Sequence, residues 1–189
     1  YKAEDIKNFD DIEEVLKKCQ EVHPELYPMI PSDLNNGCFL NYVKGEFDVV
    51  TSGVGVDIDD DASDGITVIN TYDTEKYKEM AEKAYDWNQK GYFMPDSTTN
   101  TTTRQDLFRA NTAFSYYGNQ HPGTATQETM NSGKEIVSIP IGRSTISTSS
   151  VNFCQWAIPA QCENPKKALA VLNLLYSDSD FQNLFRYGI

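Results

Sequence analysis

The clearest sign of the architecture is the segment "TRQDLFRANTAFSYYGN", which runs from Thr103 to Asn119. Thr103 and Asp106 stand three residues apart, as in a capping box, and predict a short helix that continues to Arg109. The following residues, from Asn111 onward, read as a strand that runs into a glycine-asparagine turn. A helix that leads directly into a strand is the basic unit of an α/β fold.

The same alternation of helix and strand signals extends in both directions from this segment. Asp10 and Glu13 predict the start of a first helix that Pro24 stops, and Asp73 predicts the start of a second long helix. Further helices are expected from about 122 to 131, after Asn164 with Pro165 at the first helical position, and at the chain end. Strands are expected over 47–53, 135–142 and 152–160, and residues 25–31 are expected to be extended. This pattern predicts an α/β fold with a mostly parallel sheet flanked by helices.

An acidic stretch, "GVGVDIDDDASDGITVIN", allows two interpretations. Asp57, Asp59 and Asp61 have the spacing of calcium ligands in an EF-hand loop. However, Ala62 and Val68 stand where that loop needs glycine and glutamate. The favoured interpretation is a hairpin whose two strands are joined by a turn at Asp64 and Gly65.

Composition narrows the range of functions. The 189 residues carry a net charge of −12, which argues against nucleic acid and anionic membranes as partners. No apolar run approaches the ~18–20 residues of a membrane span. The four cysteines contain no CxxC pair, so no metal site is predicted. Cys19 is expected to pack as a small apolar side chain, whereas a Cys154–Cys162 disulfide remains open.

Candidate binding residues are aromatic rings and amides near predicted strand ends, where open α/β sheets bind ligands. Such rings stack on the C–H faces of sugars while amides pair with hydroxyl groups. Adjacent strand residues face opposite ways, so one of the two tyrosines could lie in the core. The strongest candidates are Tyr117, Asn119 and Trp156, and the weaker ones are Tyr116, Gln120 and Gln155.

Motifs of nucleophilic, phosphate-binding, dinucleotide-binding and zinc-protease sites are absent from the sequence. The sequence therefore predicts a binding protein rather than an enzyme, with no cofactor. An alternative is a secreted glycan-active enzyme or its carbohydrate-binding accessory domain, which would need two carboxylates flanking a groove. A protein-interaction domain is a third interpretation.

Two longer segments resemble one protein family. "KGYFMPDSTTNTTTRQDLFRANTAFSYYGN" and "WAIPAQCENPKKALAVLNLLYSDSDFQNLFRYGI" resemble the extracellular solute-binding proteins of ABC transporters, family 1, of the lipoprotein type of Gram-positive bacteria. The resemblance covers the chain at family level, and the terminal segment is its most specific part. Asn111 departs from it, because glycine is common at that position.

This resemblance implies part of a two-lobed fold, the periplasmic-binding-protein-like type II fold. Residues 1–148 would form the second lobe. Residues 149–189 would form a hinge-crossing strand and two helices that pack on the first lobe, unless they fold back or exchange between two copies in a dimer. The implied function is extracellular capture of a solute for an ABC importer permease, by a protein anchored to the membrane as a lipoprotein. The aromatic and amide candidates favour a sugar, specifically an oligosaccharide, with peptides and other polar solutes left open.

Overall fold

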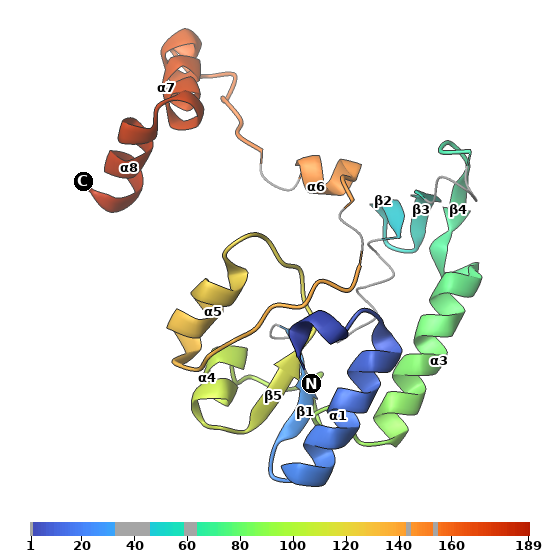
Figure 1. Ribbon diagram of the computed structural model, residues 1–189. Helices are drawn as coiled ribbons and strands as arrows, with labels where there is room; N and C mark the ends of the chain where they lie inside the picture. Colours follow the sequence, from blue (N-terminus) through green and yellow to red (C-terminus); the bar gives the residue numbers. More distant parts are fainter. Residues whose placement is uncertain (1, 33–45, 59–63, 143–144, 153–154) are drawn as a thin grey trace. The chain divides into compact units, whose positions relative to one another are not determined.

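The computed structural model describes residues 2–32, 46–58, 64–142, 145–152 and 155–189. The chain divides into two compact units, Tyr1–Ser150 and Val151–Ile189. This division lies two residues beyond the predicted boundary between residues 148 and 149. Figure 1 shows the order of the helices and strands in each unit.

A parallel pair of strands lies at the centre of the first unit. Strands β1 (Tyr27–Ile30) and β5 (Ala113–Tyr116) pair in parallel, and a single parallel bridge joins Met29 to Phe93 on the other side of β1. A helix precedes each of these three extended segments: α1 (Phe9–Val22), α3 (Glu75–Gln89) and α4 (Arg104–Arg109). The predicted α/β fold class is therefore confirmed, with two described strands in its parallel sheet.

Two hydrophobic clusters lie on opposite faces of this parallel pair. Met29 belongs to a cluster around the fully buried Trp87, between the sheet and helices α1 and α3. Ile30, the next residue, belongs to a cluster with Leu107 and Phe108 of α4. Side chains alternate along a strand, so consecutive residues of β1 bury themselves against different helices. Figure 1 shows α1 and α3 on one side of the strands and α4 on the other.

Helix α1 begins two residues earlier than the sequence predicts. The cap is Asn8, whose side-chain oxygen accepts hydrogen bonds from the backbone N–H groups of Asp10 and Asp11. The Asp11 carboxylate reaches back to the Asn8 backbone N–H at 3.2 Å. The predicted capping box of Asp10 and Glu13 is therefore wrong. The reason is tertiary, because both carboxylates are used by side chains of α3.

The remaining helices largely follow the prediction. Helix α3 is capped by Thr74 rather than Asp73, and α4 has the predicted cap of Thr103 with Asp106. Gly133 ends α5 with a positive φ of 69°, a conformation that glycine adopts without steric cost. The other helical segments are η1 (Ala3–Asp5), η2 (Thr71–Asp73), α5 (Thr124–Ser132), α6 (Thr148–Asn152), α7 (Pro165–Ser177) and α8 (Ser179–Tyr187).

The predicted hairpin is present and belongs to an antiparallel sheet. The strands of this sheet are β2 (Phe47–Thr51), β3 (Val54–Asp57) and β4 (Val68–Asn70), in the order β2-β3-β4. The predicted hairpin is formed by β3 and β4. The Asp64 carboxylate accepts hydrogen bonds from the backbone N–H groups of Ile66 and Thr67, which shapes the chain entering β4. Residues 59–63, which carry two of the three candidate calcium ligands, lie outside the described residues.

Two predicted strands are not strands in the structure. Residues 135–142 lie outside any helix or strand, and the Ile136 N–H donates to the Thr129 hydroxyl instead of to a neighbouring strand. The second prediction covered residues 152–160. Asn152 ends α6 and residues 155–159 are irregular, whereas residues 153 and 154 lie outside the described part. A β-branched sequence favours extended backbone, but a strand also requires a partner edge for its hydrogen bonds.

The second unit consists mainly of α7 and α8, which contact each other along the chain. Pro165 occupies the first turn of α7, as predicted, and neither helix buries a residue fully. Large apolar side chains are exposed on both helices: Leu169, Val171, Leu174, Leu184 and Phe185. No helix in the described ranges has the length and apolar character of a membrane span.

The described cysteines are free thiols. Cys19 is buried on α1, as predicted, and burial together with the charge of Glu25 raises its pKa. Cys162 is half-buried and free. Its proposed disulfide partner, Cys154, lies outside the described residues.

Candidate ligand-binding site

The carboxyl ends of β1 and β5 lie next to each other, because the two strands run in parallel with Ile30 opposite Tyr116. The chain continues from them into Ser32 on one side and into residues 117–120 on the other. Four predicted site residues follow each other at the end of β5: Tyr116, Tyr117, Asn119 and Gln120. This edge of the sheet is the expected position of a ligand site in an open α/β fold.

Tyr116 and Tyr117 face opposite sides of the sheet, as predicted from their adjacent positions. The Tyr116 ring lies 6.1 Å from Phe108 in an edge-on arrangement. The Tyr117 ring lies 6.1 Å from Phe9, which belongs to the other cluster. Both tyrosines are half-buried, so each side chain combines packing with partial solvent contact.

The two amide residues lie beyond the strand in exposed positions. Gln120 accepts a hydrogen bond from the Ser138 hydroxyl, whereas Asn119 is exposed on the same turn. Gly118 stands between the tyrosines and these amides. A Cβ atom at Gly118 would lie 3.2 Å from the Tyr116 ring and 3.5 Å from Ser32 Cβ. The turn therefore packs tightly against the ends of both strands.

An ion pair that the sequence did not predict, Arg104–Glu128, lies next to this edge of the sheet. Arg104 Nη2 lies 2.9 Å from Glu128 Oε1, and Gln105 Nε2 donates to Glu128 Oε2 at 3.3 Å. The Arg104 guanidinium also lies 5.0 Å from the centre of the Tyr116 ring. Nothing in the spacing of these residues distinguishes them from other charged pairs, so the contact could be found only in three dimensions.

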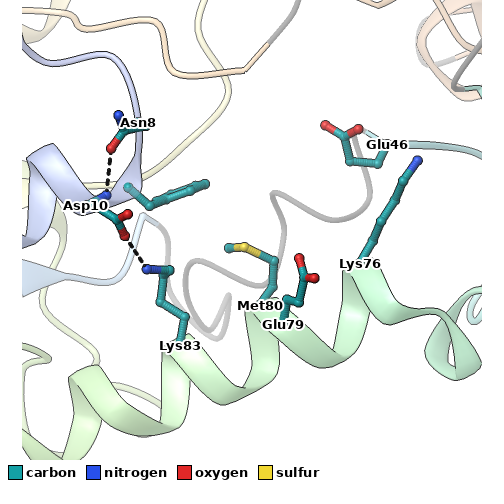
Figure 2. A pocket seen from close by; sticks show the side chains of 8 residues that line it. Asn8, Asp10, Glu46, Lys76, Glu79, Met80 and Lys83 are labelled. Carbon is teal, nitrogen blue, oxygen red and sulfur yellow. Dashed lines mark hydrogen bonds and ion pairs between the residues drawn. The ribbon is translucent and has the colours of Figure 1, made fainter.

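A pocket of about 360 Å³ lies between the N-terminal part of α1 and the first half of α3 (Figure 2). Phe9 lines this pocket and also contacts Tyr117, so the pocket adjoins the tyrosine side of the edge. Its walls are formed by Asn8, Phe9, Asp10, Glu46, Lys76, Glu79, Met80 and Lys83.

The charged groups of this pocket are largely paired within the protein. Asp10 Oδ1 lies 2.7 Å from Lys83 Nζ, and the hydrogen bond from that ammonium lowers the pKa of Asp10. Lys76 Nζ lies 2.9 Å from Asp57 Oδ1 of β3. The wall therefore combines the apolar side chains of Phe9 and Met80 with charges that are fixed by ion pairs. The sequence contains no signal for it, because Asp10 and Lys83 are 73 residues apart.

The remaining two predicted residues, Gln155 and Trp156, belong to the second unit. The Trp156 side chain is 61% exposed, and its indole N–H donates to the Tyr176 hydroxyl at 3.0 Å. Gln155 Nε2 donates to Asn152 Oδ1 at 2.8 Å. Tyr176 was not among the predicted residues, and it holds the exposed indole ring in one orientation.

The described ranges contain no candidate metal site, because no three His, Cys, Asp or Glu side chains lie close enough together there to bind a metal ion. Residues 33–45, 59–63, 143–144 and 153–154 lie outside those ranges.

Comparisons with known proteins identify the fold. No protein-family profile and no curated protein sequence matches the chain. Three crystal structures do match, all of the N-glycan transport solute binding protein (NgtS) from Streptococcus pneumoniae. The first has 20% identity and a TM-score of 0.75, and it covers 95% of this chain and 38% of that protein.

The other two structures are complexes of the same protein. The complex with Man1GlcNAc has 22% identity and a TM-score of 0.67, covering 95% of this chain and 39% of that protein. The complex with Man5GlcNAc has 22% identity and a TM-score of 0.66, covering 95% and 38%. This chain thus spans less than two fifths of the length of the solved proteins it matches. Over that length it has the α/β fold of a solute-binding protein, as the sequence predicts.

Proposed function

We propose that this chain is part of an extracellular solute-binding protein that captures an oligosaccharide and delivers it to an ABC importer permease. The observation that carries the proposal is the similarity, over 95% of the chain, to a protein whose crystal structures contain Man1GlcNAc and Man5GlcNAc. The protein is anchored to the outer face of the membrane as a lipoprotein. It makes and breaks no covalent bond.

Residues 1–148 form the second lobe of this protein, and residues 149–189 pack on the first lobe. Two observations support this assignment. The chain divides into compact units between Ser150 and Val151. In addition, α7 and α8 bury no residue fully and expose several large apolar side chains, which a first lobe would cover.

The ligand is held by aromatic rings and amides. Tyr117, Asn119 and Trp156 make the main contacts, and Tyr116, Gln120 and Gln155 contribute less. The rings stack on sugar C–H faces, and the amides pair with hydroxyl groups. Binding closes the two lobes about a hinge, and the permease recognises the closed form.

Thermal-shift and calorimetric measurements on the full protein test this function. Mannose-containing N-glycan fragments such as Man5GlcNAc are the first probes, with peptides as the comparison class. A ligand at 100 times its dissociation constant stabilises the folded state by about 2.7 kcal/mol. We expect Tyr117→Ala and Trp156→Ala to weaken binding. Tyr85→Ala, at a tyrosine that is 69% exposed on α3, is the matched control and leaves affinity unchanged. If no sugar raises the melting temperature, the function is refuted.

A glycan-active enzyme remains the second candidate because three carboxylates line the pocket beside Phe9. Glycoside hydrolysis requires a carboxylic acid with a raised pKa. The pKa of Asp10 is lowered by its hydrogen bond from Lys83, which favours a carboxylate that binds over an acid that donates protons. Incubation with Man5GlcNAc followed by mass spectrometry separates the candidates, because only an enzyme releases shorter products.

A further inference from the structure

The Arg104–Glu128 pair is nearly enclosed by protein. The side chain of Glu128 is 6% exposed and that of Arg104 is 21% exposed. Arg104 reaches Glu128 with two nitrogens, through Nη2 at 2.9 Å and through Nε at 3.4 Å. The pair therefore joins α4 to α5 through a bidentate contact of the planar guanidinium.

The same guanidinium also contacts the carboxyl ends of both parallel strands. Its Nη1 donates to the backbone carbonyl of Ser32, just after β1. Its plane lies over the ring of Tyr116, the last residue of β5, at 5.0 Å. One side chain thus links two strand ends that are more than 80 positions apart in the chain.

These contacts restrict what Tyr116 can do. The guanidinium lies over one face of the ring, Phe108 packs against it edge-on, and Gly118 approaches the ring so closely that a Cβ there would lie 3.2 Å away. A ring held in this way is better suited to supporting the neighbouring turn than to stacking on a sugar. The turn that it supports carries Asn119 and Gln120.

The energetics of buried ion pairs point to positioning rather than to stability. Removing two charges from water offsets much of their mutual attraction, so a buried pair contributes little net stability. A guanidinium holds several groups in a fixed mutual geometry because its N–H donors form a rigid plane, whereas the three donors of a lysine ammonium rotate. This favours a role in setting the geometry of the edge.

We propose that Arg104, fixed by Glu128, is a positioning residue that orients the ligand-binding turn through Tyr116 and the Ser32 carbonyl, without touching the ligand. This inference rests on the proposed function. It specifies the weaker contribution of Tyr116 as support of the turn and leaves direct contact to Tyr117, Trp156 and the amides.

Arg104→Lys in the full protein is the central test, with Man5GlcNAc as the probe. The variant keeps the charge beside Glu128 but loses the planar contacts with Tyr116 and Ser32. We expect affinity by calorimetry to fall about tenfold, as loss of a charge-assisted hydrogen bond predicts. We also expect faster hydrogen exchange in peptides covering residues 116–120. Arg109→Lys is the matched control, because Arg109 lies on the same helix and its guanidinium contacts Asp106 and the Asn131 carbonyl of α5 rather than a strand end.

A double-mutant cycle separates positioning from direct contact. If Tyr116 acts together with Arg104, Tyr116→Leu and Arg104→Lys give non-additive losses of affinity. Additive losses would mean that Tyr116 contacts the ligand independently, and they overturn the inference. Affinity and exchange in Arg104→Lys that equal those of the control also overturn it. If that variant does not fold, Glu128→Gln with the same two measurements takes its place.

Failure of the proposed function has a different signature. In that case the unmodified protein binds no glycan, yet the exchange comparison between Arg104→Lys and Arg109→Lys still decides whether Arg104 orders the turn. Unchanged exchange at residues 116–120 then refutes the positioning role by itself.

Discussion

Replacing Trp87 with phenylalanine should destabilise the first unit by about 2–3 kcal/mol, a magnitude that follows from two contributions. The indole is fully buried, and its N–H donates to Glu13 Oε2 at 2.9 Å. A hydrogen bond to a charged group contributes about 1.5–3 kcal/mol. Glu13 keeps Lys90 as a partner, so the lower half of that range applies. The smaller ring leaves a space that costs about 1 kcal/mol more.

The effect extends to the candidate site because Trp87 packs 6.3 Å from Phe9, which in turn contacts Tyr117. The assay is urea denaturation of the purified protein followed by far-UV circular dichroism. Trp156→Phe is the control, because Trp156 is 61% exposed and its loss should cost less than about 0.5 kcal/mol. Equal losses for the two variants, or a loss below about 1 kcal/mol for Trp87→Phe, would refute the reasoning.

The Trp87 prediction also has a pH dependence. Burial acts to raise the pKa of Glu13, but hydrogen bonds from Lys90 and Trp87 outweigh it, so the pKa lies below its ordinary value of 4.5. A lowered pKa in the folded state means that the carboxylate contributes stability above pH 4.5, and that this stability is lost as the pH falls through the lowered pKa. The difference between wild type and Trp87→Phe should therefore shrink as the pH falls below 4.5 and through the lowered pKa of Glu13.

Three further outcomes are expected. The carboxyl group of Asp64 should titrate with a pKa of about 2, because a threonine hydroxyl and then backbone N–H groups donate to it, as carboxyl NMR shifts would reveal. The stability that this carboxylate gives to the turn should be lost progressively as the pH falls from 3.8 to about 2. Gly53→Ala should destabilise the β2-β3-β4 sheet by about 2 kcal/mol or more, since φ is 77° and the new Cβ would lie 2.5 Å from the ring of Tyr72. Gly65→Ala should cost about 1 kcal/mol, because nothing lies within 4 Å of the new Cβ. Hydrogen exchange of the amides in this sheet compares the two variants. Tyr176→Phe should shift the indole N–H resonance of Trp156, leave that of the other tryptophan in place, and weaken oligosaccharide binding by about two- to fivefold.

Local signals in the sequence predicted many element boundaries correctly. The Thr103 cap of α4, the Gly133 end of α5, the Pro165 start of α7 and the hairpin at Asp64 all appear as expected. The hairpin requires β3 and β4 to pair over 12 to 16 positions, but the three helix ends depend on atoms within about four residues of each other. Such interactions form in the same way whatever the rest of the chain does.

The predictions that were wrong depended on distant partners. Asp10 has the chemistry of a cap, but Lys83 of another helix pairs with it, and Asn8 caps α1 instead. Residues 135–142 have the composition of a strand, yet sheet formation requires a free edge beside them, and composition does not specify one.

The sequence by itself therefore determined the α/β class, most helix ends and the opposite orientation of Tyr116 and Tyr117, because periodicity and capping act over a few residues. The tertiary structure alone decided which charges meet between different helices and strands. The contacts that form the pocket beside Phe9 and the joint between Arg104, Glu128 and Ser32 connect residues 24, 72 and 73 positions apart. The physical reason is that an ion pair depends on the distance between two charges in space. For residues far apart in the chain, that distance is set by how the core packs.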